Sequence, residues 1–137
     1  MALNPAITLL LLSVTTTFWV KGSGALLMGS PLIALNVEYP SDRYIFCERD
    51  PELLYALRER VKRKAPWADV VFVSGSCDDC VQGILRAVPA ASSSSTVLSL
   101  CLVDPFDFGL KFETLHRLSG VYIDFLVLLG RADGCKS

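Results

Sequence analysis

Four apolar stretches of strand length, separated by segments with helical spacing, constrain the fold of this chain more than any other feature. The strand-like runs are 43–47, 70–73, 96–103 and 121–129. Helical patterns separate them between Asp50 and Pro66, at 79–88 and at 111–118. Continuous apolar runs are typical of strands covered on both faces, and strand–helix alternation is typical of crossovers between parallel strands. We therefore expect an α/β fold, a Rossmann-like open and mostly parallel sheet with helices on both faces.

The segment after the first of these strands carries the clearest helix signal. Asp50, Pro51 and Glu52 provide an N-cap residue, a proline at the first helical position and an early acid. Positive charges collect in the last turns, where they suit the helix dipole, and Pro66 ends the pattern. These basic residues, from Arg58 to Lys64, either contact the phosphates of a nucleic acid or form a solvated helix end, which is the commoner use of such charges.

The start of the chain is almost without charge, since no charged side chain occurs from Met1 to Val20. Residues 6–20 include four consecutive leucines, as a secretory signal or a membrane anchor would. No Lys or Arg precedes this run, and no A-x-A-like cleavage site follows it. The β-branched stretch from Val14 to Val20 equally suits a buried strand that leads into the turn at 22–24. Both interpretations stay open.

Composition excludes several classes of protein. The chain has 137 residues, enough for one domain, and with 52% hydrophobic and 20% charged residues it is not intrinsically disordered. The formal charge of -1 excludes a global attraction to nucleic acid or to an anionic surface. Five cysteines are an odd number and do not indicate a disulfide framework, so we expect a reducing, cytoplasmic location. Membrane association through residues 1–20 is the alternative.

Polar residues and glycines follow the predicted strands, which is where an open parallel sheet binds its ligands. Gly22 and Gly24 allow a close approach of the backbone to a ligand. Glu48, at the end of the next strand, can accept hydrogen bonds from a ribose diol. Ser76, Cys77 and Asp78 follow the third strand and can frame an adenine. Together these groups suit a nucleoside.

Several of these segments together resemble the three-Cys-motif partner protein family (TcmP). They are Gly29 to Leu35, Tyr44 to Pro51, Leu102 to Phe106 and Ile123 to Leu126. The resemblance covers roughly residues 29–129, and we place a Rossmann-like domain at 29–130 between a divergent apolar segment at 1–28 and a tail at 131–137. The family resembles S-adenosylmethionine-dependent methyltransferases in fold. Its name refers to cysteines of a partner, a radical-SAM-type iron–sulfur protein.

The resemblance implies S-adenosylmethionine as cofactor, with Glu48 at the ribose, residues 76–78 at the adenine, and Gly22 and Gly24 at the methionine end. Asp104, Pro105 and Phe106 are similar to the acid-Pro-aromatic segment with which amino-methyltransferases hold an exocyclic amine for in-line methyl transfer. The alternative is a purely structural role, in which Pro105 ends a strand and Phe106 packs beneath a loop.

Two departures from the family favour a second function. Phe18 stands where the family has an acid at the end of its first strand, and the sequence stops one strand past Asp124, whereas a full methyltransferase sheet would continue through further strands. A non-catalytic partner of the iron–sulfur protein therefore stands beside the methyltransferase-like enzyme as an alternative. An incomplete sheet would also expose an edge and apolar surface, which favours a partner or self-association.

Cys77 and Cys80 form a single C-x-x-C pair. The pair is half a metal site, a redox pair, or two incidental thiols near the start of a helix, which is the commonest case. With His116 as the single histidine there are too few ligands for a structural zinc, and we expect no metal site.

Overall fold

The computed structural model describes residues 4–12, 17–19, 22–23, 26–103 and 110–127. Its strands are β1 (Ala6–Leu12), β2 (Thr17–Trp19), β3 (Leu26–Met28), β4 (Arg43–Glu48), β5 (Val70–Ser74), β6 (Val97–Val103) and β7 (Ile123–Val127). Its helices are α1 (Ser30–Leu35), α2 (Pro51–Lys64), α3 (Val81–Ala87) and α4 (Phe112–Leu118). The strands and helices predicted from residue 43 onward are all present, with ends shifted by a few residues.

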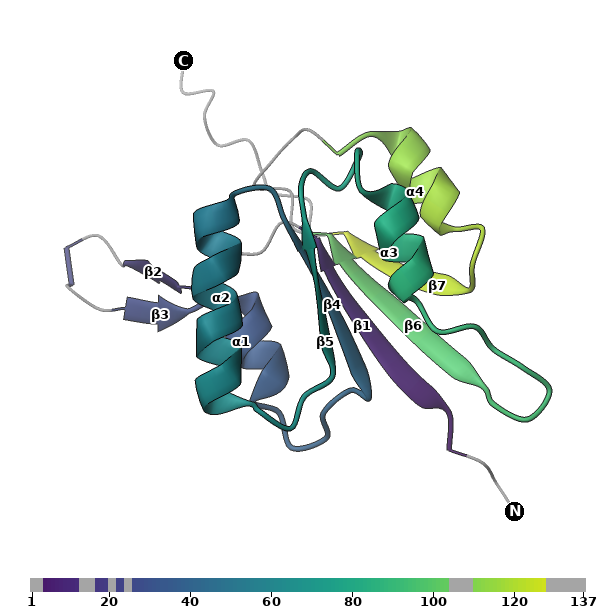
Figure 1. Cartoon of the computed structure of the whole chain (residues 1–137), viewed down its shortest axis with the longest axis horizontal. Coiled ribbons are helices and arrows are strands. Elements are labelled where there is room, and N and C mark those ends of the chain that lie inside the picture. The colour runs from purple at the N-terminus through teal and green to yellow at the C-terminus, as the bar shows by residue number, and fades with distance from the viewer. Residues whose placement is uncertain (1–3, 13–16, 20–21, 24–25, 104–109, 128–137) are drawn as a thin grey trace.

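Five strands form one parallel sheet in the order β5-β4-β1-β6-β7, which confirms the predicted α/β, Rossmann-like open sheet (Figure 1). The chain moves outward from β1 through β4 to β5, then returns to the other side of β1 for β6 and β7. The order therefore reverses between β1 and β6, where Leu12 lies opposite Val103 at the carboxyl ends. Doubly wound sheets bind ligands at such a reversal point.

The first strand of the sheet lies earlier than the sequence indicated. Of the stretch from Val14 to Val20, the described residues Thr17–Trp19 do form a strand, but this strand pairs antiparallel with Leu26–Met28 in a separate two-stranded sheet and is not part of the parallel sheet. The central strand is Ala6–Leu12 instead. Such a strand needs apolar side chains on both faces, and its consecutive buried leucines Leu10, Leu11 and Leu12 provide them. Among the described helices, none is long and apolar enough to cross a bilayer.

Helices cover the sheet on both faces, as predicted (Figure 1). On one face, side chains of α1 and α2 pack on β1 and β4; the buried set includes Leu11, Leu32, Leu35, Tyr44, Phe46, Leu57 and Val61. On the other face, α3 and α4 pack on β1, β4 and β6; the buried set includes Leu10, Leu12, Ile45, Cys47, Val81, Ile84, Cys101 and Leu118. Alternate residues of each central strand thus serve two separate cores.

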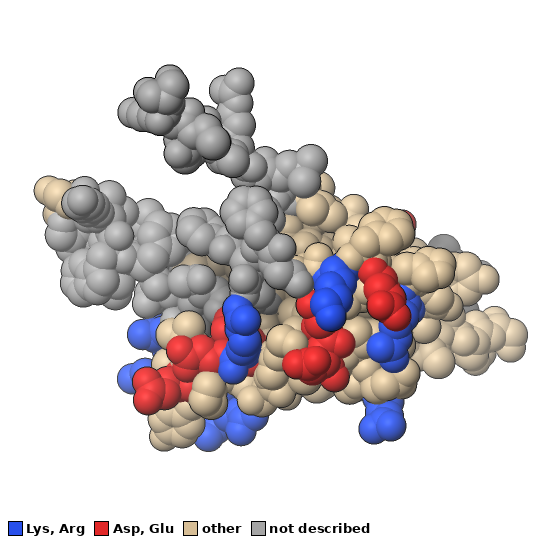
Figure 2. Space-filling view, turned by 90° about the horizontal axis from the view of Figure 1, so that it is seen from above, with Lys and Arg blue, Asp and Glu red and all other residues tan. Residues whose placement is uncertain are grey.

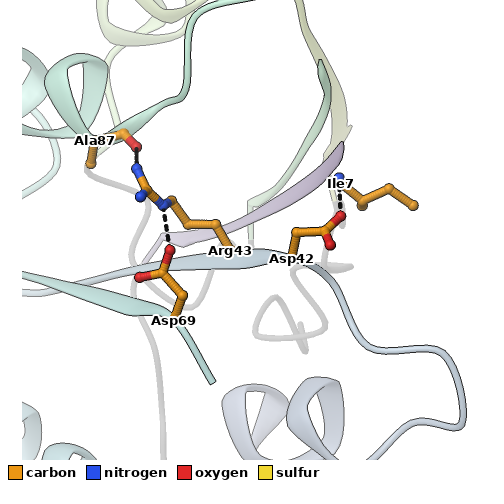
Figure 3. Close-up of polar contacts among 5 residues, drawn as sticks. All are labelled: Ile7, Asp42, Arg43, Asp69 and Ala87. Atoms are coloured by element: carbon orange, nitrogen blue, oxygen red, sulfur yellow. Dashed lines mark hydrogen bonds and ion pairs between the residues drawn. The ribbon is translucent and has the colours of Figure 1, made fainter. Parts of the chain in front are cut away.

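Polar contacts fix the amino-terminal edge of the sheet (Figure 3). The Arg43 guanidinium donates from Nε to Asp69 Oδ2 at 2.9 Å and from Nη1 to the Ala87 carbonyl at 3.0 Å. Ile7 N donates to Asp42 Oδ2 at 2.7 Å, and Asp42 N donates back to the Ile7 carbonyl at 2.8 Å. These bonds hold the starts of β1, β4 and β5 and the end of α3 in register, at the edge opposite the carboxyl ends of the strands.

Part of the sheet on the α1 and α2 side carries exposed apolar side chains. Leu10, Cys101 and Phe125 belong to the opposite core. Strand alternation therefore places the residues at odd spacings from them, Ile7, Leu98, Leu100 and Leu126, on this face. Their exposed fractions are 44%, 53%, 38% and 51%. Among the described residues, the cluster beneath α1 and α2 takes its buried sheet residues from β1 and β4, and from β6 and β7 it includes only the half-buried Leu102. The exposed apolar surface expected from the sequence is therefore present.

The predicted N-cap of α2 is confirmed and gives a direct test of the helix signal. Asp50 Oδ1 accepts from Glu52 N at 2.9 Å and from Leu53 N at 3.4 Å. Asp50→Ala removes both acceptors, so we expect the free energy of unfolding in urea to fall by about 1 kcal/mol. Asp50→Ser is the control, because it keeps a side-chain oxygen that can cap the helix. Its free energy of unfolding should fall by at most a few tenths of the loss expected for Asp50→Ala. Equal losses for the two variants would contradict the cap.

Candidate functional site

The carboxyl ends of β4 and β5 form one side of the candidate site. Glu48 and Ser74 lie opposite each other in the last pair of these strands. Gly75 N donates to the Glu48 carbonyl at 3.0 Å, which holds the loop after β5 against the end of β4. Gly75 has φ +136°, a conformation that side chains other than glycine rarely adopt. The backbone thus brings Glu48 and the loop at 75–80 together, as the sequence predicted for strands ending at one edge.

The half-buried Glu48 carboxylate lies at this edge, and one of its oxygens accepts a hydrogen bond from the backbone. Its Oε1 accepts from Asp50 N at 3.0 Å, a bond to the backbone at the start of α2. A carboxylate oxygen has two lone-pair directions, and the group has two oxygens. The bond to Asp50 N therefore orients the carboxylate and leaves acceptor capacity for a ligand hydroxyl.

Ser76 folds the loop after β5 into a turn. Its carbonyl accepts from Asp79 N at 3.2 Å and from Cys80 N at 3.0 Å. Its hydroxyl accepts from Asp79 N at 3.2 Å and donates to Asp79 Oδ2 at 2.9 Å. The Ser76 hydroxyl thus stabilises the turn itself, and the role predicted for it at an adenine requires a contact beyond these bonds.

Asp78 joins this loop to the start of α4. Its Oδ1 accepts from Lys111 N at 3.1 Å and from the hydroxyl of Thr114. Thr114 is buried, while Asp78 is half-buried. Asp78, which the sequence predicted to contact an adenine, therefore uses one carboxylate oxygen to bind the start of α4, 33 residues or more further along the chain.

Four cysteines converge beneath the same loop. Cys47, Cys77 and Cys101 are buried in one core cluster, and the half-buried Cys80 packs against it. A side-chain hydrogen bond with Cys77 is the largest cause that raises the pKa of the Cys47 thiol, followed by burial. Burial raises the pKa of Cys101 to about 12, with a further contribution from Cys77. Burial, Asp79 and Cys77 raise the pKa of Cys80. Cys77 therefore faces the core and the other thiols.

The remaining predicted site residues are not brought to this edge within the described part of the chain. Gly22, with φ +88°, lies in the turn between β2 and β3. Phe18 lies in β2 and not at the end of a parallel strand. The expectation for the methionine end rested on a parallel strand ending near Val20, whereas the described part of that segment, Thr17–Trp19, pairs antiparallel with β3. Gly24, Asp104, Pro105 and Phe106 lie outside the described residues.

The charges at the carboxyl edge are mixed. Figure 2 views the molecule from above, the side at which α2 and α3 begin in Figure 1. Acidic and basic side chains lie side by side there, and where the atoms are not grey neither sign forms a continuous patch. In residues 4–12, 17–19, 22–23, 26–103 and 110–127, no group of three or more His, Cys, Asp or Glu side chains is arranged to hold a metal ion.

Sequence reasoning missed the convergence of the cysteines, although it contained a signal. Cys47 lies near the end of one buried strand, and Cys101 lies in another, while Cys77 and Cys80 follow a third. Strands ending at one edge bring such residues together, but the order of the strands and the face on which each thiol lies are needed to see it.

In comparisons with known proteins, no family model, no curated protein and no solved structure matches the chain.

Proposed function

We propose that the chain is an S-adenosylmethionine-binding, methyltransferase-like domain of the three-Cys-motif partner type. One observation carries the proposal: Glu48 ends β4, the neighbour of the first strand in a doubly wound parallel sheet. An acid at this place in such sheets accepts hydrogen bonds from the ribose hydroxyls of an adenosine cofactor. The choice of S-adenosylmethionine among such cofactors comes from the family resemblance of the segments around Glu48.

In this proposal the chain's own groups bind and orient the cofactor. The Glu48 carboxylate accepts hydrogen bonds from the ribose diol. The turn at 76–78 lies beside Glu48 because Gly75 N donates to the Glu48 carbonyl. Since the side chains of Ser76 and Asp78 already serve the turn and α4, the adenine would meet this turn partly through backbone groups. Asp104 and Phe106 would hold an amine substrate, with the nitrogen lone pair toward the methyl group.

Glu48→Gln tests the ribose contact. The variant keeps an oxygen that can accept from Asp50 N but removes the negative charge that strengthens bonds to ribose hydroxyls. We expect calorimetric titration with S-adenosylmethionine and with S-adenosylhomocysteine to give an affinity about 5- to 150-fold lower than for the unchanged chain, equivalent to about 1–3 kcal/mol.

Glu52→Gln is the matched control, because Glu52 is an exposed acid in the first turn of α2 and contributes no side-chain contact to the proposed site. Its affinity should equal that of the unchanged chain. If a folded sample of the unchanged chain binds neither ligand, or if Glu48→Gln binds as well as Glu52→Gln, the proposal is wrong.

A non-catalytic partner of a radical-SAM-type iron–sulfur protein is the second candidate. The exposed apolar face formed by Ile7, Leu98, Leu100 and Leu126 favours it, because contiguous apolar surface on a folded protein marks an interaction site. The same titration separates the two candidates, since a partner protein would be folded and would bind neither ligand. Leu98→Asp with Leu126→Asp should then abolish the complex with the iron–sulfur protein, whereas Glu48→Gln should leave it intact.

A further inference from the structure

The geometry around Gly75 places two thiols of the cysteine cluster on one short backbone segment. Cys47 Sγ donates to the Gly75 carbonyl at 3.4 Å, and Cys80 Sγ donates to the Ser74 carbonyl at 3.4 Å. A Cβ added at Gly75 would lie 2.5 Å from Cys80 Sγ. The sulfur of Cys80 therefore occupies the space beside Gly75 that any larger residue would need.

The turn at 76–80 brings Cys77 and Cys80 within reach of each other. The bond from Cys80 N to the Ser76 carbonyl closes the turn, and the two cysteines stand three positions apart within it. Residues at this spacing in a helical turn have Cβ atoms about 5–6 Å apart, and small rotations bring them to the separation found in disulfides. Cys80 is half-buried and reachable from solvent, whereas Cys77 is 8% exposed.

We propose that Cys80 and Cys77 form a reversible thiol–disulfide site that exchanges with a low-molecular-weight disulfide. The Cys80 thiolate attacks one sulfur of the external disulfide, forms a mixed disulfide and releases one external thiolate. The Cys77 thiolate then attacks Cys80 Sγ, which forms the Cys77–Cys80 bond and releases the second external thiolate. The two protons from the protein thiols go to the two departing thiolates, so two thiols and one disulfide yield one disulfide and two thiols.

This inference goes beyond the cofactor proposal and does not depend on it. Asp78 lies between the two cysteines, and its carboxylate accepts hydrogen bonds from Lys111 N and from the Thr114 hydroxyl. Closing a disulfide across Asp78 changes the turn that presents this carboxylate. Oxidation should therefore accelerate hydrogen exchange of the first amides of α4, and reduction should restore their protection.

The test uses the full chain with Cys135→Ser, so that no cysteine outside the described residues contributes. The reduced protein is incubated with oxidised glutathione under nitrogen, and its intact mass and peptides are measured. We expect the loss of two thiols with no glutathione retained, the loss of two hydrogens from the peptide that contains Cys77 and Cys80, and full reversal by dithiothreitol.

Variants assign the two roles. Cys77→Ser should accumulate one glutathione on Cys80, because the second step is blocked, and Cys80→Ser should take up none. Cys101→Ser is the control and should behave like the unchanged protein, and Cys77→Ala replaces Cys77→Ser if the serine variant does not fold. The proposal is overturned if all thiols stay free, if the disulfide joins Cys47 to Cys77, or if Cys77→Ser closes a Cys47–Cys80 bond instead of keeping glutathione.

Discussion

Replacing Gly75 by alanine is expected to lower the free energy of unfolding by about 2–6 kcal/mol, because backbone strain and overpacking each cost about 1–3 kcal/mol. The strain arises because φ at this residue is +136°. The overpacking arises because the new Cβ would lie 2.5 Å from Cys80 Sγ. Urea unfolding followed by circular dichroism measures the total.

A second substitution separates these two contributions. Cys80→Ala removes the sulfur that the new Cβ would meet, so Gly75→Ala should cost about 1–3 kcal/mol less in a Cys80→Ala background, and the strain should remain. Gly83→Ala is the matched control, since Gly83 lies in α3 and its added Cβ would only touch Val73 Cγ1 at 3.9 Å.

The control should change stability in the opposite direction. Alanine within a helix is more favourable than glycine by about 0.5–1 kcal/mol, so Gly83→Ala should stabilise the chain. Similar effects of the two glycine replacements would mean that the loop after β5 does not hold Gly75 at a positive φ beside Cys80 Sγ.

The helix α2 shows why part of the fold could be predicted from the sequence. Its signals are local: Asp50 accepts from amides two and three residues ahead, and Pro51 follows it at the first helical position. The strands β5 and β6 are likewise marked by continuous apolar runs between helices. The N-terminal segment has no such local signals for where a strand starts and ends, since leucines and β-branched residues both suit strands. The formation of the central strand at Ala6–Leu12 depends on its pairing with β4 and β6.

The candidate site likewise has one part that could be predicted from the sequence and one part that could not. The position of Glu48 follows from the end of a strand and could be predicted, whereas the use of Asp78 could not. Its partners, Lys111 and Thr114, lie 33 and 36 residues away, and no spacing in the sequence links an acid in one loop to a helix start so far along the chain. The assembly of the cysteines also depends on tertiary contacts across three strands.

Phe46→Ala is expected to lower the free energy of unfolding by about 3–5 kcal/mol, the usual range for deleting a buried aromatic ring. Phe46 is fully buried, and its ring lies 5.9 Å from that of Tyr44 and 6.1 Å from that of Phe72, in tilted and edge arrangements that add to the area it buries. The cavity would open between β4, β5 and α2. Chemical unfolding with a fit of both the midpoint and the slope measures the loss.

Phe112→Ala is the control, because the Phe112 side chain in α4 is 81% exposed. It should change stability by less than about 0.5 kcal/mol. Phe46 also stands two residues before Glu48 in the same strand, and both side chains are anchored by that strand's pairing with β5. If the proposed cofactor contact is made by Glu48, Phe46→Ala should weaken binding of S-adenosylmethionine under conditions where the variant is still folded, whereas Phe112→Ala should not. A loss below about 1 kcal/mol for Phe46→Ala would contradict the aromatic core on this face of the sheet.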